Sequence, residues 1–332
     1  MFIRRASKIT GDNAISELNV VTIGGVEQWI YIRGKNRNKP ILLMLHGGPG
    51  TGQIGFIREF QFDLEQHFVV VQWDQRGSGL SYSKKIPPES MNIDQFVQDT
   101  IEVTKYILNR LERQQLYLIG HSWGTILGIL AVTHAPQLYK RYFGVAQVTH
   151  VKSSDRISYT KLLEKAQIEN NEKAYEALFQ IGPPPWSDLK HDRTHQKYIE
   201  TFGGGITHEG KMVRKILLSL LKSKEYTLRD CIRFLQGQFF SMKNLQAEIL
   251  QLNLMERIDR VNIPIHFIMG KHDLTTPYEP TKKFFNKIEA PEKKWLMFEN
   301  SAHSPMWEEP EKFMEVLLLE TKKDCIYKRF FC

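Results

Sequence analysis

The sequence predicts an α/β fold with a mostly parallel central sheet and an inserted helical cap. Three observations lead to this prediction. Short, nearly continuous apolar runs recur between helical stretches, as strands buried on both faces of a parallel sheet do. A long segment rich in charge and helix formers then interrupts them. Sheet-like sequence returns near the C-terminus, so the chain is expected to enter one sheet twice.

The predicted sheet begins with a hairpin. Two β-like runs, LNVVTI at residues 18–23 and QWIYIR at residues 28–33, flank Gly24-Gly25, which is a turn signal. Three nearly continuous apolar runs of the kind found in buried strands follow, at residues 40–47, 68–74 and 116–120. We therefore expect an antiparallel start and a parallel centre.

Helical spacing connects these runs. Residues 93–111 repeat apolar side chains with a helical period, and Asn92 precedes them as a candidate N-cap. A second helix is expected from Ser122 to Pro136, followed by a strand at residues 143–148. Strand, helix and strand in succession predict right-handed crossovers with helices on both faces of the sheet.

The break in this pattern defines the predicted domains. Residues 151–262 are assigned to a helical cap, interrupted by GPPP at 182–185 and GGG at 203–205. Residues 1–150 and 263–332 are assigned to the α/β core. Within the second part, strands are expected at 263–270 and 294–298 and a helix at 310–321.

Composition excludes several classes of function. The chain has 332 residues, of which 42% are hydrophobic and 25% charged, as in an ordinary globular domain. No apolar run approaches the roughly 18 residues of a membrane span, and no apolar stretch follows the N-terminal arginines. We expect a cytoplasmic protein with no membrane partner.

Charge and cysteine content exclude further partners. The net charge is +8, but the basic residues are scattered among acidic ones, so no nucleic-acid partner is expected. Cys231, Cys325 and Cys332 lack the spacing of metal ligands or of a disulfide framework. We expect reduced thiols and no metal.

The stretch LIGHSWGTILG places a serine where a predicted strand meets a predicted helix. Gly120 and Gly124 flank Ser122 at the spacing of a nucleophile elbow, where larger side chains would collide with neighbouring elements. The turn also puts Ser122 at a helix N-terminus, which favours a developing negative charge. Ser122 is the candidate nucleophile.

A serine nucleophile needs a histidine base and a carboxylate that orients it. IMGKHDLTTP and FENSAHSPMWEEP each follow a predicted strand, in the order expected for such a triad. Asp273 and His303 are therefore the candidates, with Asp155 as the alternative acid.

Two glycine-rich loops complete the predicted site. Trp123 follows the nucleophile and offers one backbone N–H for an oxyanion hole, and Gly48 of HGGPG offers the other, with Gly47 as the alternative. DQRGSG lies on the same rim of the sheet. Asp74 and Arg76 could contact substrate there, but an ion pair between them is the favoured interpretation.

HGGPG, DQRGSG, GHSWG, the aspartate of GKHD and the late histidine occur in an order that resembles the prolyl aminopeptidase (proline iminopeptidase) family of α/β hydrolases. The likeness is strong over residues 41–132, returns over 263–310 and is weak across the cap. It implies the α/β-hydrolase fold and a triad of Ser122, Asp273 and His303 that releases an N-terminal residue, often proline, through an acyl-enzyme. It implies no metal or organic cofactor.

The cap departs from the family pattern. Members that select a free N-terminus bind the ammonium through acidic cap residues, and the nearest equivalent here, QGQFF, has Gln236 in place of the glutamate. Losing that charge weakens the preference for a cation. Three cap acids are candidate substitutes: Glu200, Glu209 and Glu176. The apolar side chains Phe239, Phe240, Trp186 and Met242 line an acyl pocket in one interpretation and the cap core in the other.

The favoured function is a serine hydrolase that acts as an aminopeptidase on a small molecule or short peptide. One alternative keeps the same machinery but cleaves carboxylic esters or lactones. A third, a binding protein of the same fold without turnover, conflicts with the complete set of triad and oxyanion residues. The sequence leaves the oligomeric state open.

Overall fold

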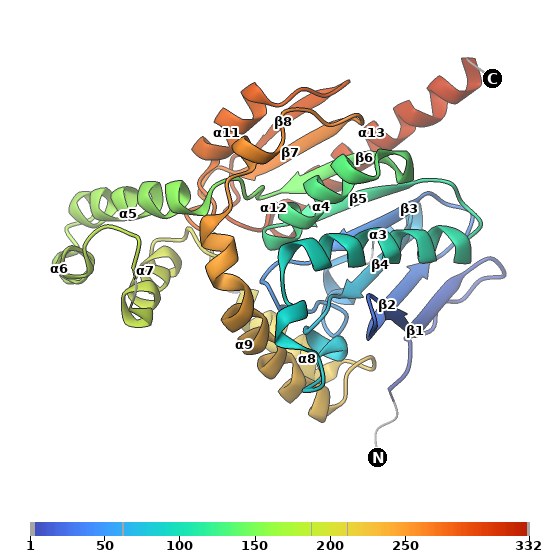
Figure 1. The fold of residues 1–332 in the computed structure, drawn as a ribbon, viewed down its shortest axis with the longest axis horizontal. Coiled ribbons are helices and arrows are strands. Elements are labelled where there is room, and N and C mark those ends of the chain that lie inside the picture. The colour runs from blue at the N-terminus through green and yellow to red at the C-terminus, as the bar shows by residue number, and fades with distance from the viewer. Residues whose placement is uncertain (1–3, 62, 187, 211, 331–332) are drawn as a thin grey trace.

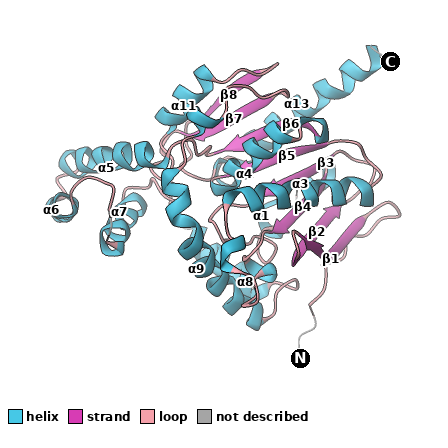
Figure 2. Ribbon diagram, in the orientation of Figure 1, coloured by secondary structure: helices cyan, strands magenta, loops and turns pink. Residues whose placement is uncertain are grey.

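The computed structural model describes residues 4–61, 63–186, 188–210 and 212–330. These residues build one eight-stranded sheet with helices on both of its faces (Figures 1 and 2). The strand order is β1-β2-β4-β3-β5-β6-β7-β8. The predicted α/β fold class is confirmed.

The sheet is mostly parallel. The first pair, β1 (Ile15–Ile23) and β2 (Val26–Gly34), is the predicted hairpin, and β2 runs antiparallel to β4 as well. All other neighbours are parallel. The remaining strands are β3 (Ile41–Leu45), β4 (Val69–Asp74), β5 (Leu116–His121), β6 (Tyr139–Val145), β7 (Ile265–Gly270) and β8 (Lys293–Phe298).

Each face of the sheet buries its own apolar core. One core packs the sheet against α3 (Ile93–Arg110), α4 (Trp123–His134) and α11 (Tyr278–Lys287). The other packs it against α2 (Leu64–His67), α12 (Pro305–Glu308) and α13 (Pro310–Phe330). The helices thus cover both faces and leave the carboxyl ends of the parallel strands to the loops.

The predicted start of α3 is confirmed in detail. The side chain of Asn92 accepts a hydrogen bond from the backbone N–H of Gln95 at 2.9 Å, which satisfies one of the free donors in the first helical turn. A cap of this kind stabilises a helix by about 1 kcal/mol.

The strand predicted at residues 143–148 was placed too late, since β6 covers Tyr139–Val145. Its first half contains Arg141, which is buried because Asp324 and Glu292 accept from its guanidinium, so the start of the strand does not look apolar. The strand ends at Val145 because the next residue, Ala146, has a φ of 50°. The last helix also continues past the predicted residue 321, to Phe330.

Between β6 and β7 the chain is helical. The longer helices of this segment are α5 (Val151–Ile168), α6 (Glu172–Ile181), α7 (Leu189–Thr201), α8 (Met212–Lys222) and α9 (Leu228–Gln251), followed by α10 (Leu254–Arg257). In Figure 1 the first three project to one side of the sheet, whereas α8 and α9 lie towards the N-terminal strands. The cap boundaries at 151 and 262 stay a prediction. Among the described residues, no helix combines the length and apolarity needed to cross a bilayer.

Candidate active site

Ser122 occupies the sharp turn between β5 and α4. Its backbone has a φ of 52° and a ψ of −120°, a conformation that costs a non-glycine residue roughly 1–3 kcal/mol. The predicted steric role of Gly124 is evident, because a Cβ there would lie 2.3 Å from the carbonyl oxygen of Leu45. Ser122 is half-buried. The turn therefore holds its hydroxyl beside the carboxyl ends of the central strands.

Asp273 and His303 lie in the loops that follow β7 and β8, and they are in contact. The Nδ1 atom of His303 is 2.9 Å from Oδ2 of Asp273. Thr276 donates to the same carboxylate from its hydroxyl at 2.6 Å and from its N–H at 2.8 Å. The structure thus brings together two of the predicted triad side chains.

The environment keeps Asp273 ionised. Burial acts to raise the pKa of this carboxyl, but the charge of His303 and the hydrogen bonds from His303 and Thr276 outweigh it, so the pKa is lowered overall. An ionised Asp273 accepts the Nδ1–H of His303 and leaves the other ring nitrogen free to take a proton.

His121 connects Ser122 to the His303 loop. Its Nε2 atom donates to the carbonyl oxygen of His303 at 2.8 Å, and the two ring centroids are 5.0 Å apart. Burial lowers the pKa of His121 to about 3, so its ring is neutral. Among the described residues, Ser122 and His303 are joined through this neighbour and not by a direct hydrogen bond.

Gln75 holds together the two segments that carry the predicted oxyanion donors, the HGGPG loop and the first turn of α4. The Gln75 side chain donates to the carbonyl oxygen of His46 at 3.1 Å and accepts from the indole N–H of Trp123 at 2.9 Å. Gln75 is fully buried. It therefore fixes the start of HGGPG relative to the residue after the nucleophile.

Both predicted donor groups are free to bind an anion. In the described part of the chain, no backbone carbonyl accepts from the N–H of Gly48 or of Trp123. Gly48 is exposed and has a φ of 123°, which only glycine adopts easily. Gly47, the alternative, is buried, and a Cβ on it would lie 3.3 Å from the Cβ of Ser122.

This arrangement of sheet, elbow and acid–histidine pair agrees with a sequence comparison. A family model described as the alpha/beta hydrolase fold matches residues 40–310. The chain belongs to the α/β-hydrolase fold family. The enzyme class predicted from its motifs, a hydrolase of this fold, is confirmed.

Curated relatives within the α/β-hydrolase family are peptidases by name. The probable aminopeptidase YbaC of Bacillus subtilis is 42% identical over 310 residues, which cover 92% of this chain and 96% of YbaC. The proline iminopeptidase of Clostridioides difficile is 27% identical over 88% of this chain and 94% of its own length. The resemblance to the proline iminopeptidase family is thereby confirmed.

Solved α/β hydrolases support the fold alone. A proline iminopeptidase of Mycobacterium smegmatis superposes with a TM-score of 0.61 at 18% identity, covering 92% of this chain and 98% of that one. Est816, described as an N-acyl homoserine lactone degrading enzyme, gives a TM-score of 0.62 at 17% identity over 90% of this chain and 98% of its own. Proteins with different named substrates thus share this architecture.

The cap places the QGQFF residues on different sides of α9. Gln236 is exposed, and Phe239 is 72% exposed. Phe240 is half-buried, with its ring centroid 5.7 Å from that of Tyr82. The amide that reaches the HGGPG loop belongs instead to Gln238, whose Nε2 lies 3.3 Å from the hydroxyl of Thr51. Sequence inspection missed Gln238, although it stands two residues from Gln236.

Of the three candidate cap acids, Glu200 is tied to the His303 loop. Its carboxylate accepts from the N–H of Ile206 at 3.2 Å and borders Gly205, where a Cβ would lie 2.2 Å from it. The carbonyl oxygen of Gly205 accepts from the N–H of His303 at 3.2 Å. Glu200 itself is exposed, as are the other two candidates, Glu176 and Glu209.

The expected ion pair between Asp74 and Arg76 is wrong. Arg76 pairs instead with Asp99 of α3, which accepts from its Nε at 2.8 Å and its Nη2 at 2.9 Å. This bidentate geometry is favourable for an arginine–carboxylate pair. Asp74 instead accepts from the Tyr226 hydroxyl at 2.5 Å and the Leu80 N–H at 2.9 Å. Burial raises the pKa of Asp74 to about 6 despite these bonds. The side chains of Asp74 and Arg76 are both buried, and their hydrogen bonds hold the DQRGSG loop in place.

Asp155, the alternative acid of the triad, lies in the first half of α5. Burial and the charge of Asp192 raise its pKa to about 7, and no hydrogen bond joins it to His303 among the described residues. Asp273 therefore holds the place beside the histidine.

Sequence inspection also missed two glutamates that fix the His303 loop. Glu308 accepts from the N–H of Ala302 at 2.9 Å, and Glu309 accepts from the Ser301 hydroxyl at 2.6 Å. Both belong to the WEEP stretch and stand five and six residues after the histidine. Two consecutive acidic residues so soon after the candidate histidine were the sequence signal for these contacts.

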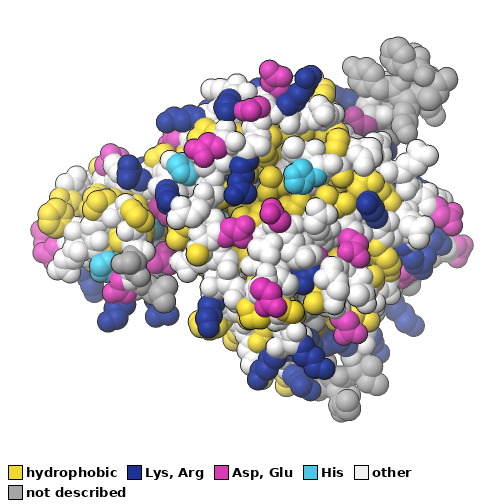
Figure 3. Space-filling view, viewed as in Figure 1, with side chains coloured by type: hydrophobic (Ala, Val, Ile, Leu, Met, Phe, Trp, Pro, Cys, Tyr) yellow, Lys and Arg dark blue, Asp and Glu magenta, His cyan; other side chains and the backbone are white. Residues whose placement is uncertain are grey.

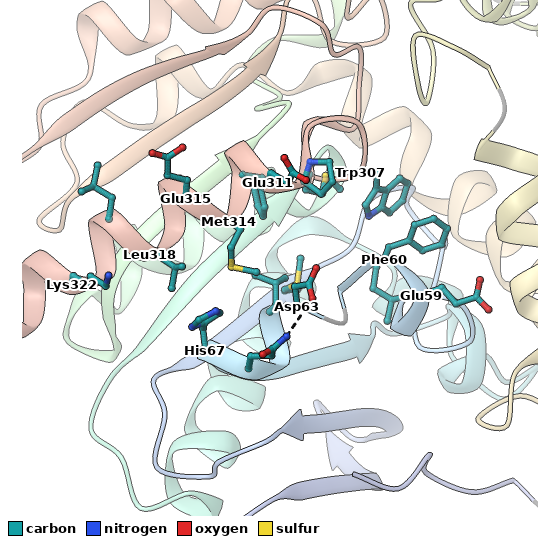
Figure 4. Close-up of a pocket in the computed structure, with 18 residues that line it drawn as sticks. Glu59, Phe60, Asp63, His67, Trp307, Glu311, Met314, Glu315, Leu318 and Lys322 are labelled. Atoms are coloured by element: carbon teal, nitrogen blue, oxygen red, sulfur yellow. Dashed lines mark hydrogen bonds between the residues drawn. The ribbon is translucent and has the colours of Figure 1, made fainter. Parts of the chain in front are cut away.

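A cavity of about 810 Å³ lies away from the predicted site, between α13 and the segment that contains α1 (Arg58–Gln61) and α2. Figure 4 shows Met314, Glu315 and Leu318 of α13 on one wall and Phe60 and Asp63 on the other. Its acidic side chains are exposed, and none of the predicted catalytic residues lines it.

Proposed function

We propose that the chain is a serine hydrolase that works through an acyl-enzyme. Ser122 attacks the acyl carbonyl while His303 accepts the hydroxyl proton on Nε2, and Asp273 keeps Nδ1 protonated and stabilises the imidazolium. His303 then gives the proton to the leaving amine. A water molecule, deprotonated by the same histidine, hydrolyses the ester on Ser122. The single observation that carries this proposal is the 2.9 Å contact between Asp273 and His303 beside the strained Ser122 turn.

We assign the oxyanion hole to the backbone N–H groups of Gly48 and Trp123. Each donor of this kind lowers the barrier by about 3 kcal/mol, because it faces charge that develops only in the transition state. Among the described residues neither the N–H of Gly48 nor that of Gly47 has a backbone acceptor, and Gly48 is preferred because it is exposed to substrate whereas Gly47 is buried.

The proposed reaction is release of an N-terminal proline or other small residue from a short peptide. The names of the curated relatives support a peptide substrate. Recognition of a free N-terminus needs an acid near the scissile bond. Glu200 is the proposed amine-binding group, since its carboxylate borders the glycine that holds the His303 backbone.

The test is a matched pair of substrates, proline naphthylamide with a free amine and its N-acetylated twin. We expect the free amine to be preferred, and Glu200→Gln to lower kcat/KM about tenfold for that substrate alone, as expected for loss of one charged hydrogen bond. Glu176→Gln, an exposed acid on α6, is the matched control. An equal loss in both Gln variants would contradict the role of Glu200.

Gln236 favours one second candidate function. The family resemblance implies a glutamate at the position of Gln236, which here is an amide exposed on α9. A carboxylesterase or lactonase with the same triad needs no cation site. Turnover of a short p-nitrophenyl ester without preference between the two naphthylamides would select this function over the aminopeptidase.

A further inference from the structure

Helices α8 and α9 carry an unusual share of exposed apolar surface. Of the thirteen large hydrophobic side chains that are exposed among the described residues, nine belong to these two helices. Four lie on α8: Val213, Leu217, Leu218 and Leu221. Five lie on α9: Leu228, Ile232, Leu235, Phe239 and Met242. Isolated exposed apolar side chains are normal, but a gathering of this size marks an interaction surface.

The five residues of α9 form one stripe. They recur at alternating intervals of four and three, which places them on a single side of the helix. The opposite side packs against the body of the protein through Phe234, Gly237 and Ser241, which are buried. The exposed stripe is therefore a continuous second face of α9. We call it, with the exposed residues of α8, the α8–α9 face.

The exposed charged side chains within residues 212–243 are all basic, although the exposed Glu59 of α1 accepts from the Ser219 hydroxyl of α8 at 2.7 Å. Six basic side chains are exposed between residues 212 and 243: Arg214, Lys215, Lys222, Lys224, Arg229 and Lys243. The only acids in that range are Glu225 and Asp230, and both are buried. Figure 3 shows Lys and Arg side chains gathered at the lower edge, where α8 lies in Figure 1.

Neither acid neutralises the exposed basic groups. Glu225 accepts from the Tyr31 hydroxyl at 2.6 Å, and Asp230 pairs with Arg4 at 2.7 Å. In the described part of the chain, no carboxylate lies within ion-pair distance of any of the six exposed basic side chains. The face therefore combines unpaired positive charge with apolar area.

We propose that the α8–α9 face binds the surface of an anionic lipid bilayer. Amphipathic helices with a basic rim and an apolar face bind in this way, lying in the interface and not spanning it. A second copy of the chain is a poorer occupant, because a twofold contact would bring the same basic groups together. The inference departs from the expectation of no membrane partner, which rested on the lack of a spanning run.

Such binding would place the bilayer beside the helix that borders the candidate active site. The buried side of α9 touches the HGGPG loop closely, since a Cβ on Gly50 would lie 2.8 Å from the Cβ of the buried Ser241. The contact surface and the proposed site thus share one helix. The proposal does not depend on which acyl substrate the site takes.

The test is sedimentation of the purified full-length chain with sucrose-loaded vesicles. We expect it to pellet with phosphatidylcholine vesicles that contain about a third phosphatidylglycerol, and much less with phosphatidylcholine alone. Salt should weaken the binding. Lys222→Gln combined with Arg229→Gln should lower the partition constant at least about tenfold, since each basic group near the surface contributes severalfold.

Two exposed isoleucines supply a matched pair. Ile232→Glu should reduce binding to anionic vesicles, whereas Ile168→Glu on α5 should not, although Ile168 is 78% exposed. Absence of pelleting, or equal effects of the two substitutions, would overturn the proposal. A gel-filtration mass of two chains that Ile232→Glu reduces to one would also overturn it, because a second copy would then cover the face.

Discussion

At the residue scale, Gln75 connects the HGGPG loop to the first turn of α4, the two segments beside Ser122. The side-chain amide of Gln75 donates to the His46 carbonyl and accepts from the Trp123 indole N–H. The backbone N–H of Gln75 donates to Nε2 of His46 at 3.1 Å. Burial lowers the pKa of His46 to about 4, so that ring stays neutral and accepts this bond. An error of about 1 Å in the placement of transition-state groups can cost about a hundredfold in rate.

Gln75→Leu should therefore act on the chemical step. We expect kcat to fall by about ten- to a hundredfold, while KM stays within about threefold, because the proposed oxyanion donors are misplaced but the cap is not. Steady-state kinetics and a thermal melt would separate this from unfolding. A rise in KM at unchanged kcat would show that Gln75 positions the substrate and not the donors.

The roles of residues in the site could be predicted from the sequence where the order of motifs along the chain constrains them. Asp273 and His303 each follow a strand, and the sheet brings those strand ends to one edge. The partner of Arg76 could not be predicted in this way. It depends on α3 lying beside the loop, and Asp99 is 23 residues away in the sequence.

At the element scale, the buried side of α9 fixes the cap segment to the core. Gly237 permits this, since a Cβ there would lie 2.6 Å from the carbonyl oxygen of Gly77. A capping box between Thr227 and Asp230 starts the helix. The sequence predicted a helical cap but not this contact, because nothing in a helical pattern identifies which face meets the sheet.

Gly237→Ala should displace α9 from the core. The added methyl meets backbone and cannot be absorbed by a side-chain rotation, so we expect a loss of roughly 1–3 kcal/mol in the free energy of unfolding. Urea denaturation measures it, and Gln236→Ala on the exposed side of the same helix is the control. Equal stability of the two variants would mean that the contact at Gly77 relaxes freely.

At the scale of the whole molecule, burial of imidazoles makes stability depend on pH. Burial lowers the pKa of His46, His195 and His266 to about 4 and that of His121 to about 3, from an ordinary 6.5. At these four rings the unfolded chain binds more protons than the folded chain between about pH 4 and 6.5. Asp74 and Asp155, with pKa values raised to about 6 and about 7, act in the opposite direction, but the four rings outnumber these two carboxyls. The free energy of unfolding should fall as the pH is lowered through that window.

His195 offers the sharpest test of this linkage. It is 1% exposed, its ring lies 4.7 Å from that of Trp186, and neither ring nitrogen has a hydrogen-bond partner among the described residues. His195→Phe should raise the free energy of unfolding at pH 5 by roughly 1–3 kcal/mol and flatten its pH dependence. Urea titrations at pH 5 and 7.5 measure both effects.

The exposed His134 supplies the control for that experiment. His134→Phe should change the free energy of unfolding by less than about 0.5 kcal/mol at either pH, because it replaces an exposed side chain. If His195→Phe destabilised the chain at both pH values, the ring nitrogens of His195 would have to be bonded in the folded protein.

The proposed mechanism depends on Ser122 being the nucleophile of an acyl transfer. The most direct measurement is the intact mass of the chain after treatment with a small fluorophosphonate. We expect one phosphonyl group on Ser122, no label on Ser122→Ala and far slower labelling of His303→Ala. An unlabelled wild-type chain, or a label that persists in Ser122→Ala, would contradict it.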